Sequence, residues 1–167
     1  MGRGVTQKMI FAALSDLISL SARLTLLDAV IFNVLICNSD SHSKNYSVLI
    51  GAGGSAKMAP LYDLMCAAVY RQVDQILPQG IAGRFNAPDL RQADWQALAD
   101  ELGLSGASTA RRVLELAERV SAACDGVASQ VEALAGDPTR VLEKIIHSIR
   151  KRCRCIQMQS FVGEEPN

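Results

Sequence analysis

The sequence predicts a mostly α-helical domain that contains one short β-hairpin. Apolar residues recur at helical spacing near both ends of the chain, and a glycine-rich turn separates two short β-prone runs near residue 50. The 167 residues, 49% of them apolar, suffice for one folded domain. We expect that domain to cover residues 1–153 and residues 154–167 to form a disordered tail.

Two helices are predicted first. Residues 5–20 carry apolar side chains at helical spacing. Ser21 can cap a second helix, from Ala22 to about Cys37. Apolar residues lie nearly all round this second helix, so we expect it to be buried at the centre of the domain.

The middle of the chain predicts the hairpin. Residues 46–50 and 56–59 are β-prone, residues 51–55 hold three glycines, and Pro60 stops the second run. A short apolar helix is expected over residues 64–70. Residues 71–94 show no clear period and contain Pro78 and Gly80, so they are predicted to form a long loop.

The remainder is predicted to be helical. The expected helices are residues 92–102, ended by Gly103; a long helix capped by Ser108 and stopped by Gly136; and a last helix that opens at Asp137-Pro138 and ends near Arg152. The last helix is rich in Lys and Arg. With zero net charge and few aromatic residues, a solvated face explains that better than a nucleic-acid stripe.

Composition narrows the class of protein. Zero net charge gives no global field toward nucleic acid or an anionic membrane. The longest apolar run, residues 24–37, includes Asp28 and Asn33 and is shorter than the ~20 residues that span a bilayer. The helical pattern that follows Met1 contains charged residues, so no signal peptide is expected. Five scattered cysteines suit a reducing cytoplasm. We therefore expect a cytoplasmic protein with no membrane partner and no direct contact with nucleic acid.

A polar stretch, "CNSDSHSKNYS", directly follows the predicted central helix. Asp40 and Asn45 are five positions apart in it, and Asp63 lies 18 positions after Asn45, just beyond the hairpin. Because a hairpin brings its two ends together, Asp63 should return close to Asn45. Two carboxylates and a carboxamide would then converge, and such oxygen ligands suit Mg²⁺.

This arrangement matches what phosphoryl transfer by kinases requires. One Asp orients the attacking hydroxyl, an Asn five residues later holds metal, and a second Asp holds metal against the phosphates. Asp40 would be the base, Asn45 and Asp63 the metal ligands, and Lys44 a cation for the developing phosphate charge.

Two linked blocks make a resemblance specific. "FNVLICNSDSHSKNYSVLI" followed by "MAPLYDLMCA" resembles the C-terminal lobe of the HipA family of serine/threonine kinase toxins, from type II toxin–antitoxin systems. The family carries an N-x-D-x-H-x-K-N-x-S-type loop, a hairpin and a Pro-x-Tyr-Asp segment. The matching residues are Asn38, Asp40, His42, Lys44, Asn45, Ser47, Pro60, Tyr62 and Asp63. The likeness covers about residues 5–149, more loosely in the C-terminal helices.

The resemblance implies a helical domain like the C-lobe of a kinase, with ATP and Mg²⁺ as cofactors. It implies that Asp40 is the catalytic base and that Asn45 and Asp63 bind the metal. The residues it assigns to the nucleotide are His42, Ser43, Lys44, Asn45, Tyr62 and Asp63. The implied partners are a HipB-like DNA-binding antitoxin and protein substrates such as aminoacyl-tRNA synthetases.

The chain begins where the C-lobe of that family begins. Residues 51–54 are glycine-rich, but they lie downstream of the catalytic loop, and Lys8 lies in a predicted helix with no strand around it. Neither can be the loop and the strand lysine that hold the phosphates in a kinase. We therefore expect a fragment, a pseudogene-like product or half of a split protein, inactive without the missing N-lobe.

Other readings remain open. The chain could be a non-catalytic remnant that binds an antitoxin or a full-length relative, or a phosphohydrolase that uses the same carboxylates with water as nucleophile. His42 could equally serve to orient the loop. Cys37 and Cys66 are expected to be small buried hydrophobes, and Cys153-x-Cys155 has no second pair with which to bind zinc.

Overall fold

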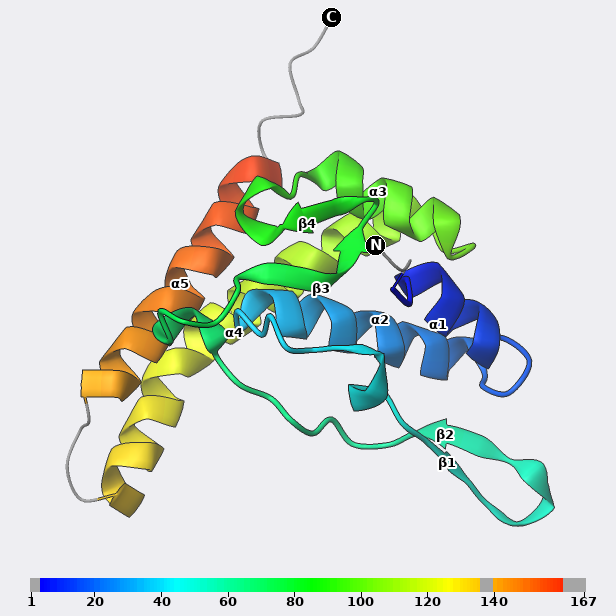
Figure 1. The fold of residues 1–167 in the computed structure, drawn as a ribbon, viewed down its shortest axis with the longest axis horizontal. Helices are drawn as coiled ribbons and strands as arrows, with labels where there is room; N and C mark the ends of the chain where they lie inside the picture. Colours follow the sequence, from blue (N-terminus) through cyan, green and yellow to red (C-terminus); the bar gives the residue numbers. More distant parts are fainter. Residues whose placement is uncertain (1–3, 136–139, 161–167) are drawn as a thin grey trace, which may run out of the picture.

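The computed structural model describes residues 4–135 and 140–160, and within them it confirms a mostly helical fold (Figure 1). The α-helices are α1 (Gln7–Leu14), α2 (Leu20–Leu35), α3 (Gln92–Glu101), α4 (Gly106–Ala135) and α5 (Arg140–Ser160). Two separate antiparallel hairpins, β1–β2 and β3–β4, accompany them. Short 3₁₀ turns complete the description: η1 (Ser43–Asn45), η2 (Ala52–Gly54), η3 (Ala67–Val69) and η4 (Ala87–Asp89).

Helix α2 lies at the centre of the core, as its all-round apolar pattern predicts. Its buried side chains include Leu26, Leu27, Ile31 and Leu35, and α4 and α5 both pack against it. The helix begins one residue after Ser19, whose hydroxyl accepts a hydrogen bond from the Ala22 N–H over 3.2 Å. The expected cap, Ser21, therefore lies inside the helix.

Helix α1 ends at Leu14, so its expected extent to Leu20 was wrong. The Ser15 hydroxyl donates to the Ala12 carbonyl over 2.9 Å, which satisfies a backbone group at the end of the helix. The chain then turns before α2 begins.

Helix α5 continues to Ser160, eight residues beyond the expected end. Residues 154–160, which we expected in a disordered tail, are helical because Cys153 and Ile156 on this helix are buried in the core, the latter only 2% exposed. Residues 136–139, with the predicted stop at Gly136 and start at Asp137-Pro138, and residues 161–167 lie outside the described part of the chain.

The predicted hairpin is present. Strand β1 (Val48–Ile50) pairs with β2 (Ala56–Met58) in the register Val48↔Met58. The turn between them uses Gly53 at φ 75°, a conformation that glycine adopts without strain. Figure 1 shows this hairpin projecting from the helical body.

A second hairpin occupies the region predicted to be a long loop. Strand β3 (Ile76–Ile81) pairs with β4 (Arg84–Asn86) through a tight turn at Ala82 and Gly83, both with positive φ. The helix expected over residues 64–70 is reduced to the single turn η3. Strand β3 packs between α1 and α3, so it adds to the core and does not form a mobile loop.

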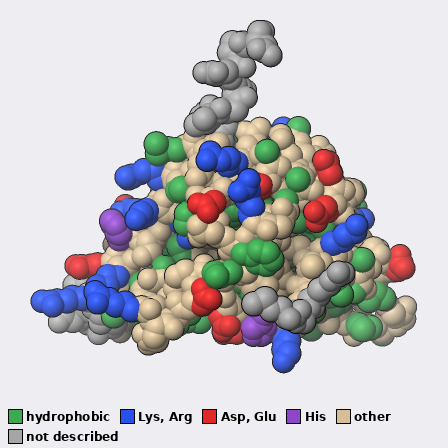
Figure 2. Space-filling model, turned by 45° about the horizontal axis from the view of Figure 1, so that its top comes forward, with side chains coloured by type: hydrophobic (Ala, Val, Ile, Leu, Met, Phe, Trp, Pro, Cys, Tyr) green, Lys and Arg blue, Asp and Glu red, His purple; other side chains and the backbone are tan. Residues whose placement is uncertain are grey.

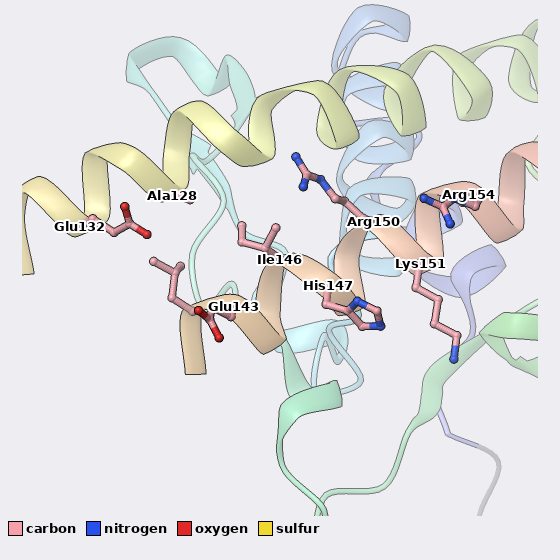
Figure 3. Close-up of a pocket in the computed structure, with 9 residues that line it drawn as sticks. Ala128, Glu132, Glu143, Ile146, His147, Arg150, Lys151 and Arg154 are labelled. Carbon is pink, nitrogen blue, oxygen red and sulfur yellow. The ribbon is translucent and has the colours of Figure 1, made fainter. Parts of the chain in front are cut away.

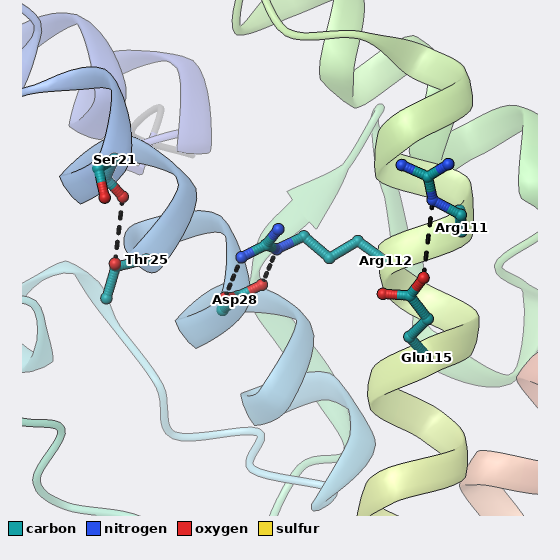
Figure 4. Close-up of polar contacts among 6 residues, drawn as sticks. All are labelled: Ser21, Thr25, Asp28, Arg111, Arg112 and Glu115. Carbon is teal, nitrogen blue, oxygen red and sulfur yellow. Dashed lines mark hydrogen bonds and ion pairs between the residues drawn. The ribbon is translucent and has the colours of Figure 1, made fainter.

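An ion pair joins α2 to α4. The Arg112 guanidinium donates to both oxygens of Asp28, with Nη2 2.6 Å from Oδ2 (Figure 4). The hydrogen bonds that Arg112 donates to the Asp28 carboxylate raise the pKa of Arg112. The figure also shows the Thr25 hydroxyl donating to the Ser21 carbonyl within α2, and the exposed pair Arg111–Glu115 along α4.

The surface carries both signs of charge. Figure 2 shows acidic and basic side chains interspersed over one face, with Lys, Arg and His side chains gathered on the side where α5 lies. No helix in the described ranges is both long enough and apolar enough to cross a bilayer.

Candidate functional site

The polar loop leaves α2 through a tight helix end. The Asn38 N–H donates to the Asn33 carbonyl over 2.9 Å, and the Cys37 N–H donates to the Val34 carbonyl over 3.2 Å. These two bonds form a Schellman motif, in which the residue just past the helix takes the left-handed conformation. Cys37 has φ 61° and occupies that position. The motif fixes the direction in which the loop starts.

The Asn38 side chain ties the parts of the loop together. It is 1% exposed, and its amide nitrogen donates to Asn33 Oδ1 over 2.8 Å and to the Asp63 carbonyl over 3.1 Å. Its oxygen accepts from the Asp40 N–H over 3.1 Å. One buried carboxamide thus connects the end of α2 with the two segments that carry Asp40 and Asp63.

Asn45 and Asp63 meet, as the hairpin argument predicts. Asn45 Nδ2 donates to Asp63 Oδ2 over 2.6 Å; Asn45 is buried, whereas Asp63 is exposed. Asp63 has φ 57°, a left-handed backbone that Asp tolerates better than most residues. The contact leaves the amide oxygen of Asn45 and the second carboxylate oxygen of Asp63 available to a ligand.

Asn45 and Asp63 suit a magnesium ion whose remaining ligands are water and phosphate oxygens. They do not suit a metal ion that is held by protein ligands alone. Within the described residues, no three His, Cys, Asp or Glu side chains cluster to hold a metal. Mg²⁺ needs only one or two protein oxygens when water and phosphate oxygens complete its coordination. Asn45 and Asp63 are the residues that would hold it, and what it would supply there is charge neutralisation of a polyphosphate.

Asp40 and Lys44 present charged groups to solvent. Asp40 is exposed, and in the described ranges its carboxylate has no hydrogen-bond or ion-pair partner. The Lys44 side chain is likewise exposed and unpaired with any described residue. Both groups are therefore free to meet a substrate.

His42 presents a buried nitrogen. Its backbone N–H donates to the Asp40 carbonyl over 2.7 Å, and its own carbonyl accepts from the Asn45 N–H over 3.0 Å. His42 Nδ1 is buried with no partner among the described residues. Ser43, the next residue, begins the turn η1.

Tyr62 fastens the base of the hairpin to the loop. Its hydroxyl lies 2.5 Å from the Lys44 carbonyl, to which it donates, and 2.7 Å from the Ser47 hydroxyl. The ring is exposed. Each residue assigned to the site from the sequence, from Asp40 to Asp63, thus lies in the loop or in the segment tied to it.

Two buried amides that the sequence reasoning missed support the loop. Gln79 of β3 is 6% exposed and lies between two backbone groups of the loop. With its nitrogen toward the Ser41 carbonyl, it donates over 2.9 Å and accepts from the Ser43 N–H over 3.0 Å. Asn33, inside α2, contacts Asn38 and the Tyr46 hydroxyl. A polar residue in the most apolar stretch of the helix was the available signal for Asn33; Gln79 had none, because its strand was not predicted.

Of two hollows of about 590 Å³ each, one lies near this loop and the other lies away from it. One, between α2 and the first hairpin, is mainly apolar and is lined by Pro60 and Leu61, directly before Tyr62. The other lies between α4 and α5 and contains none of the loop residues (Figure 3). There Glu132 and Glu143 lie toward one end and His147, Lys151 and Arg154 toward the other. The second hollow is separate from the predicted site.

Comparison with known proteins identifies the fold and the family. The profile of the HipA-like C-terminal domain matches residues 3–128. The chain belongs to this family. The part of the HipA-like domain that carries the polar loop, both hairpins and α3 lies wholly within that match.

Relatives of this HipA-like chain include named kinases. A protein of Sinorhizobium fredii named "Putative kinase Y4mE" is 31% identical over 135 residues, covering 81% of this chain and 32% of its own. The "Serine/threonine-protein kinase toxin HipA" of Shewanella oneidensis is 26% identical over 144 residues, covering 86% and 33%. The chain therefore spans about a third of the length of these relatives.

A solved structure supports the same fold. The complex of Shewanella oneidensis HipA, HipB and operator DNA contains a chain that superposes with a TM-score of 0.79 at 22% identity. The match covers 93% of the present chain and 37% of that one. The HipA-like domain described above is thus a C-terminal region by likeness to both sequences and structure.

Proposed function

We propose that this chain is the catalytic lobe of a HipA-like serine/threonine protein kinase toxin. The reaction would transfer the γ-phosphoryl group of ATP to a protein hydroxyl with Mg²⁺. The observation that carries the proposal is the Asn45–Asp63 contact of 2.6 Å beside Asp40, whose carboxylate has no partner among the described residues; the buried Asn38 bonds to the backbone of both Asp40 and Asp63.

The roles follow from the contacts. Asp40, which is exposed and has no carboxylate partner in the described part of the chain, accepts the proton of the attacking hydroxyl. Asn45 and Asp63 offer their oxygens to the metal, and Lys44 places a positive charge beside the transferring phosphoryl group. His42 and Ser43 line the nucleotide phosphates, and Tyr62 holds the segment that carries Asp63 against the loop.

The proposed partners are a HipB-like DNA-binding antitoxin, a kinase N-lobe and a protein substrate. The antitoxin is supported by the solved relative, which is titled as a complex of HipA with HipB. The N-lobe is supported by length, because the relatives are about three times as long as the region they share with this chain. A cytoplasmic location, expected from the cysteine pattern, stays a prediction.

A reconstitution experiment tests the proposal. The chain is incubated with Mg-ATP and a candidate protein substrate, alone and with the separately expressed N-terminal region of a HipA relative. Phosphoprotein that requires both parts, and that is lost with Asp40→Asn, supports the kinase. Complex formation without turnover would favour a non-catalytic remnant, and free phosphate released by the chain alone would favour a phosphohydrolase.

A further inference from the structure

Cys37 occupies a backbone position that suits glycine. It has φ 61° at the end of α2, where a side chain is strained and glycine is the usual residue. The strained conformation turns its thiol toward α5, where Sγ lies 3.7 Å from the Ser148 carbonyl. Strain of this kind can mark a residue whose chemistry matters.

Cys66 lies directly against Cys37. The Ala67 N–H donates to the Cys37 carbonyl over 3.0 Å, so the two cysteine segments lie side by side, and the Cys66 thiol has the largest effect on the pKa of Cys37. Both cysteines are free and each is 8% exposed. A disulfide requires neighbouring backbones, and the 3.0 Å bond between the Ala67 N–H and the Cys37 carbonyl brings the two cysteine segments into that relation.

The surroundings favour a thiolate on one member of the pair. The hydrogen bond from Cys66, together with the charge of Arg152 on α5, lowers the pKa of Cys37 to about 6 despite burial. The same contact raises the pKa of Cys66. Arg152 Nη1 is itself buried with no hydrogen-bond partner in the described ranges, so the thiolate is the anion within its reach.

The other groups that face the pair do not compete for oxidation. Burial raises the pKa of Cys153 on α5 to about 12 and also raises the pKa of Cys124 on α4. Reaction with peroxide needs a thiolate, so both should stay reduced near neutral pH.

We propose that Cys37 and Cys66 form a peroxide-reactive dithiol site that closes into a disulfide at the start of the polar loop. The Cys37 thiolate attacks one oxygen of hydrogen peroxide, the O–O bond breaks, and hydroxide departs as the leaving group. Cys37 is thereby converted to a sulfenic acid. The Cys66 sulfur then attacks Cys37 Sγ, the S–O bond breaks, and its proton leaves with hydroxide as water. Peroxide is the oxidant, the two thiols are oxidised, and a cellular dithiol reverses the step by exchange.

The Cys37–Cys66 disulfide would tether the start of the polar loop to the segment that carries Asp63. Cys37 immediately precedes Asn38, and Cys66 follows Asp63 by three residues. Oxidation would therefore join covalently the two segments that Asn38 now joins by a hydrogen bond of 3.1 Å. The thiol chemistry itself does not depend on the proposed kinase activity.

The test uses the chain as it is. Reduced protein is treated with hydrogen peroxide, remaining thiols are blocked with N-ethylmaleimide, and a non-reduced digest is analysed by mass spectrometry. We expect a peptide in which Cys37 is joined to Cys66 and a mass lower by two hydrogen atoms. The peroxide rate should rise with pH through a midpoint near 6, because the thiolate is the reacting form.

Single substitutions separate the role of Cys37, which reacts with peroxide, from the role of Cys66, which closes the disulfide. Cys66→Ser should leave a Cys37 sulfenic acid that dimedone captures, whereas Cys37→Ser should give neither adduct nor disulfide. Cys37→Gly, which suits the left-handed backbone, repeats that result if the serine variant does not fold. Cys155→Ser, at a half-exposed site on α5, is the matched control and should leave the disulfide unchanged. Recovery of Cys37 and Cys66 as free thiols at a peroxide dose that oxidises Cys155, or a linkage between other cysteines, would overturn the proposal.

Discussion

At the scale of single residues, the proposed reaction divides between two carboxylates with different surroundings. Asp63 contacts Asn45, whereas Asp40 contacts no described side chain through its carboxylate. In the reconstituted enzyme, Asp63→Ala should abolish metal-dependent nucleotide binding, because it removes the charge that Mg²⁺ needs to shed water. Asn45→Ala should weaken binding less, since its oxygen is neutral. Calorimetric titration with ATP, with and without Mg²⁺, measures both.

Asp40→Asn should give the opposite result. Nucleotide binding should stay near normal while turnover falls by about 10²–10⁴, the usual scale for loss of a positioned base. Binding reports the ground state and turnover the transition state, so the two effects are separable. Loss of Mg-ATP binding as severe as that of Asp63→Ala would make Asp40 a metal ligand and bring the phosphohydrolase forward.

Gln79 supports the loop through two backbone groups. Gln79→Leu keeps the approximate volume but leaves the Ser41 carbonyl and the Ser43 N–H without their partner. Buried groups left unpaired cost about 1–3 kcal/mol, so the free energy of unfolding should fall by that amount. Gln72→Leu, an exposed position on the same segment, is the control and should change it by less than about 0.5 kcal/mol in urea denaturation. Equal stabilities of the two variants would contradict the contact.

At the scale of elements, the positions of the α-helices were predictable, although the ends of α1 and α5 and the helix expected over residues 64–70 were wrong, and the second hairpin was not predicted. The apolar pattern of α2 runs all round the helix, and its burial follows directly. In β3 the buried positions alternate as a strand requires, at Leu77, Gln79 and Ile81. A buried glutamine breaks the apolar alternation, and Pro78 and Gly80 at the intervening positions are ordinarily loop residues. The strand can therefore be recognised only from the folded structure, in which Gln79 contacts the backbone of the polar loop.

Similar reasoning explains the error in the end of α5 and the correct expectation that Asp63 returns close to Asn45. The run "KRCRC" is polar by composition, yet its cysteine at position 153 is fully buried, and the helix continues past it. The approach of Asn45 to Asp63 was predictable because a hairpin brings the two ends of its chain segment together. The bridge through Asn38 was not, because it depends on which way a side chain turns after the Schellman motif.

The ion pair between α2 and α4 permits an internally controlled stability measurement. Arg112 and Asp28 are 37% and 32% exposed, whereas Arg111 and Glu115 are 73% and 60% exposed. Asp28→Asn should lower the free energy of unfolding by about 1 kcal/mol or less, and Glu115→Gln by about half of that or nothing. Both effects should shrink in high salt. No measurable loss for Asp28→Asn in chemical denaturation would show that the link between helices does not stabilise the fold.

Helix α2 should be the most slowly exchanging element of the domain. It is packed against α4, α5 and β2, so opening it requires most of the core to open. Hydrogen–deuterium exchange resolved by peptide should show the strongest protection over residues 26–35. The projecting β1–β2 hairpin is the internal reference and should exchange much faster. Rapid exchange over α2 would remove the scaffold on which the loop depends.

At the scale of the whole molecule, the candidate site is organised, but the described residues place no glycine-rich loop or strand lysine beside it. A kinase holds ATP phosphates with a glycine-rich or nest-forming loop and a strand lysine, in addition to the metal. In the described residues, the glycine-rich turn is η2 at the tip of the projecting hairpin, and Lys8 lies in α1. Neither belongs to the loop that carries Asp40 and Asn45. The chain spans about a third of the length of its kinase-named relatives, and we propose that the remaining part of such a relative supplies further phosphate contacts.

The chain alone should therefore bind Mg-ATP only weakly and transfer no phosphate. Adding the N-terminal region of a HipA relative should tighten nucleotide binding, because two half-sites then act on one ligand. The matched control is the same mixture with the Asp63→Ala chain, which should show complex formation without the gain in ATP affinity. Isothermal titration calorimetry with Mg-ATP measures the nucleotide affinity of the three samples: the chain alone, the mixture and the mixture with the Asp63→Ala chain. Micromolar affinity of the chain by itself would show that the loop, Asn45 and Asp63 suffice to hold the nucleotide, and that no second lobe is needed for binding.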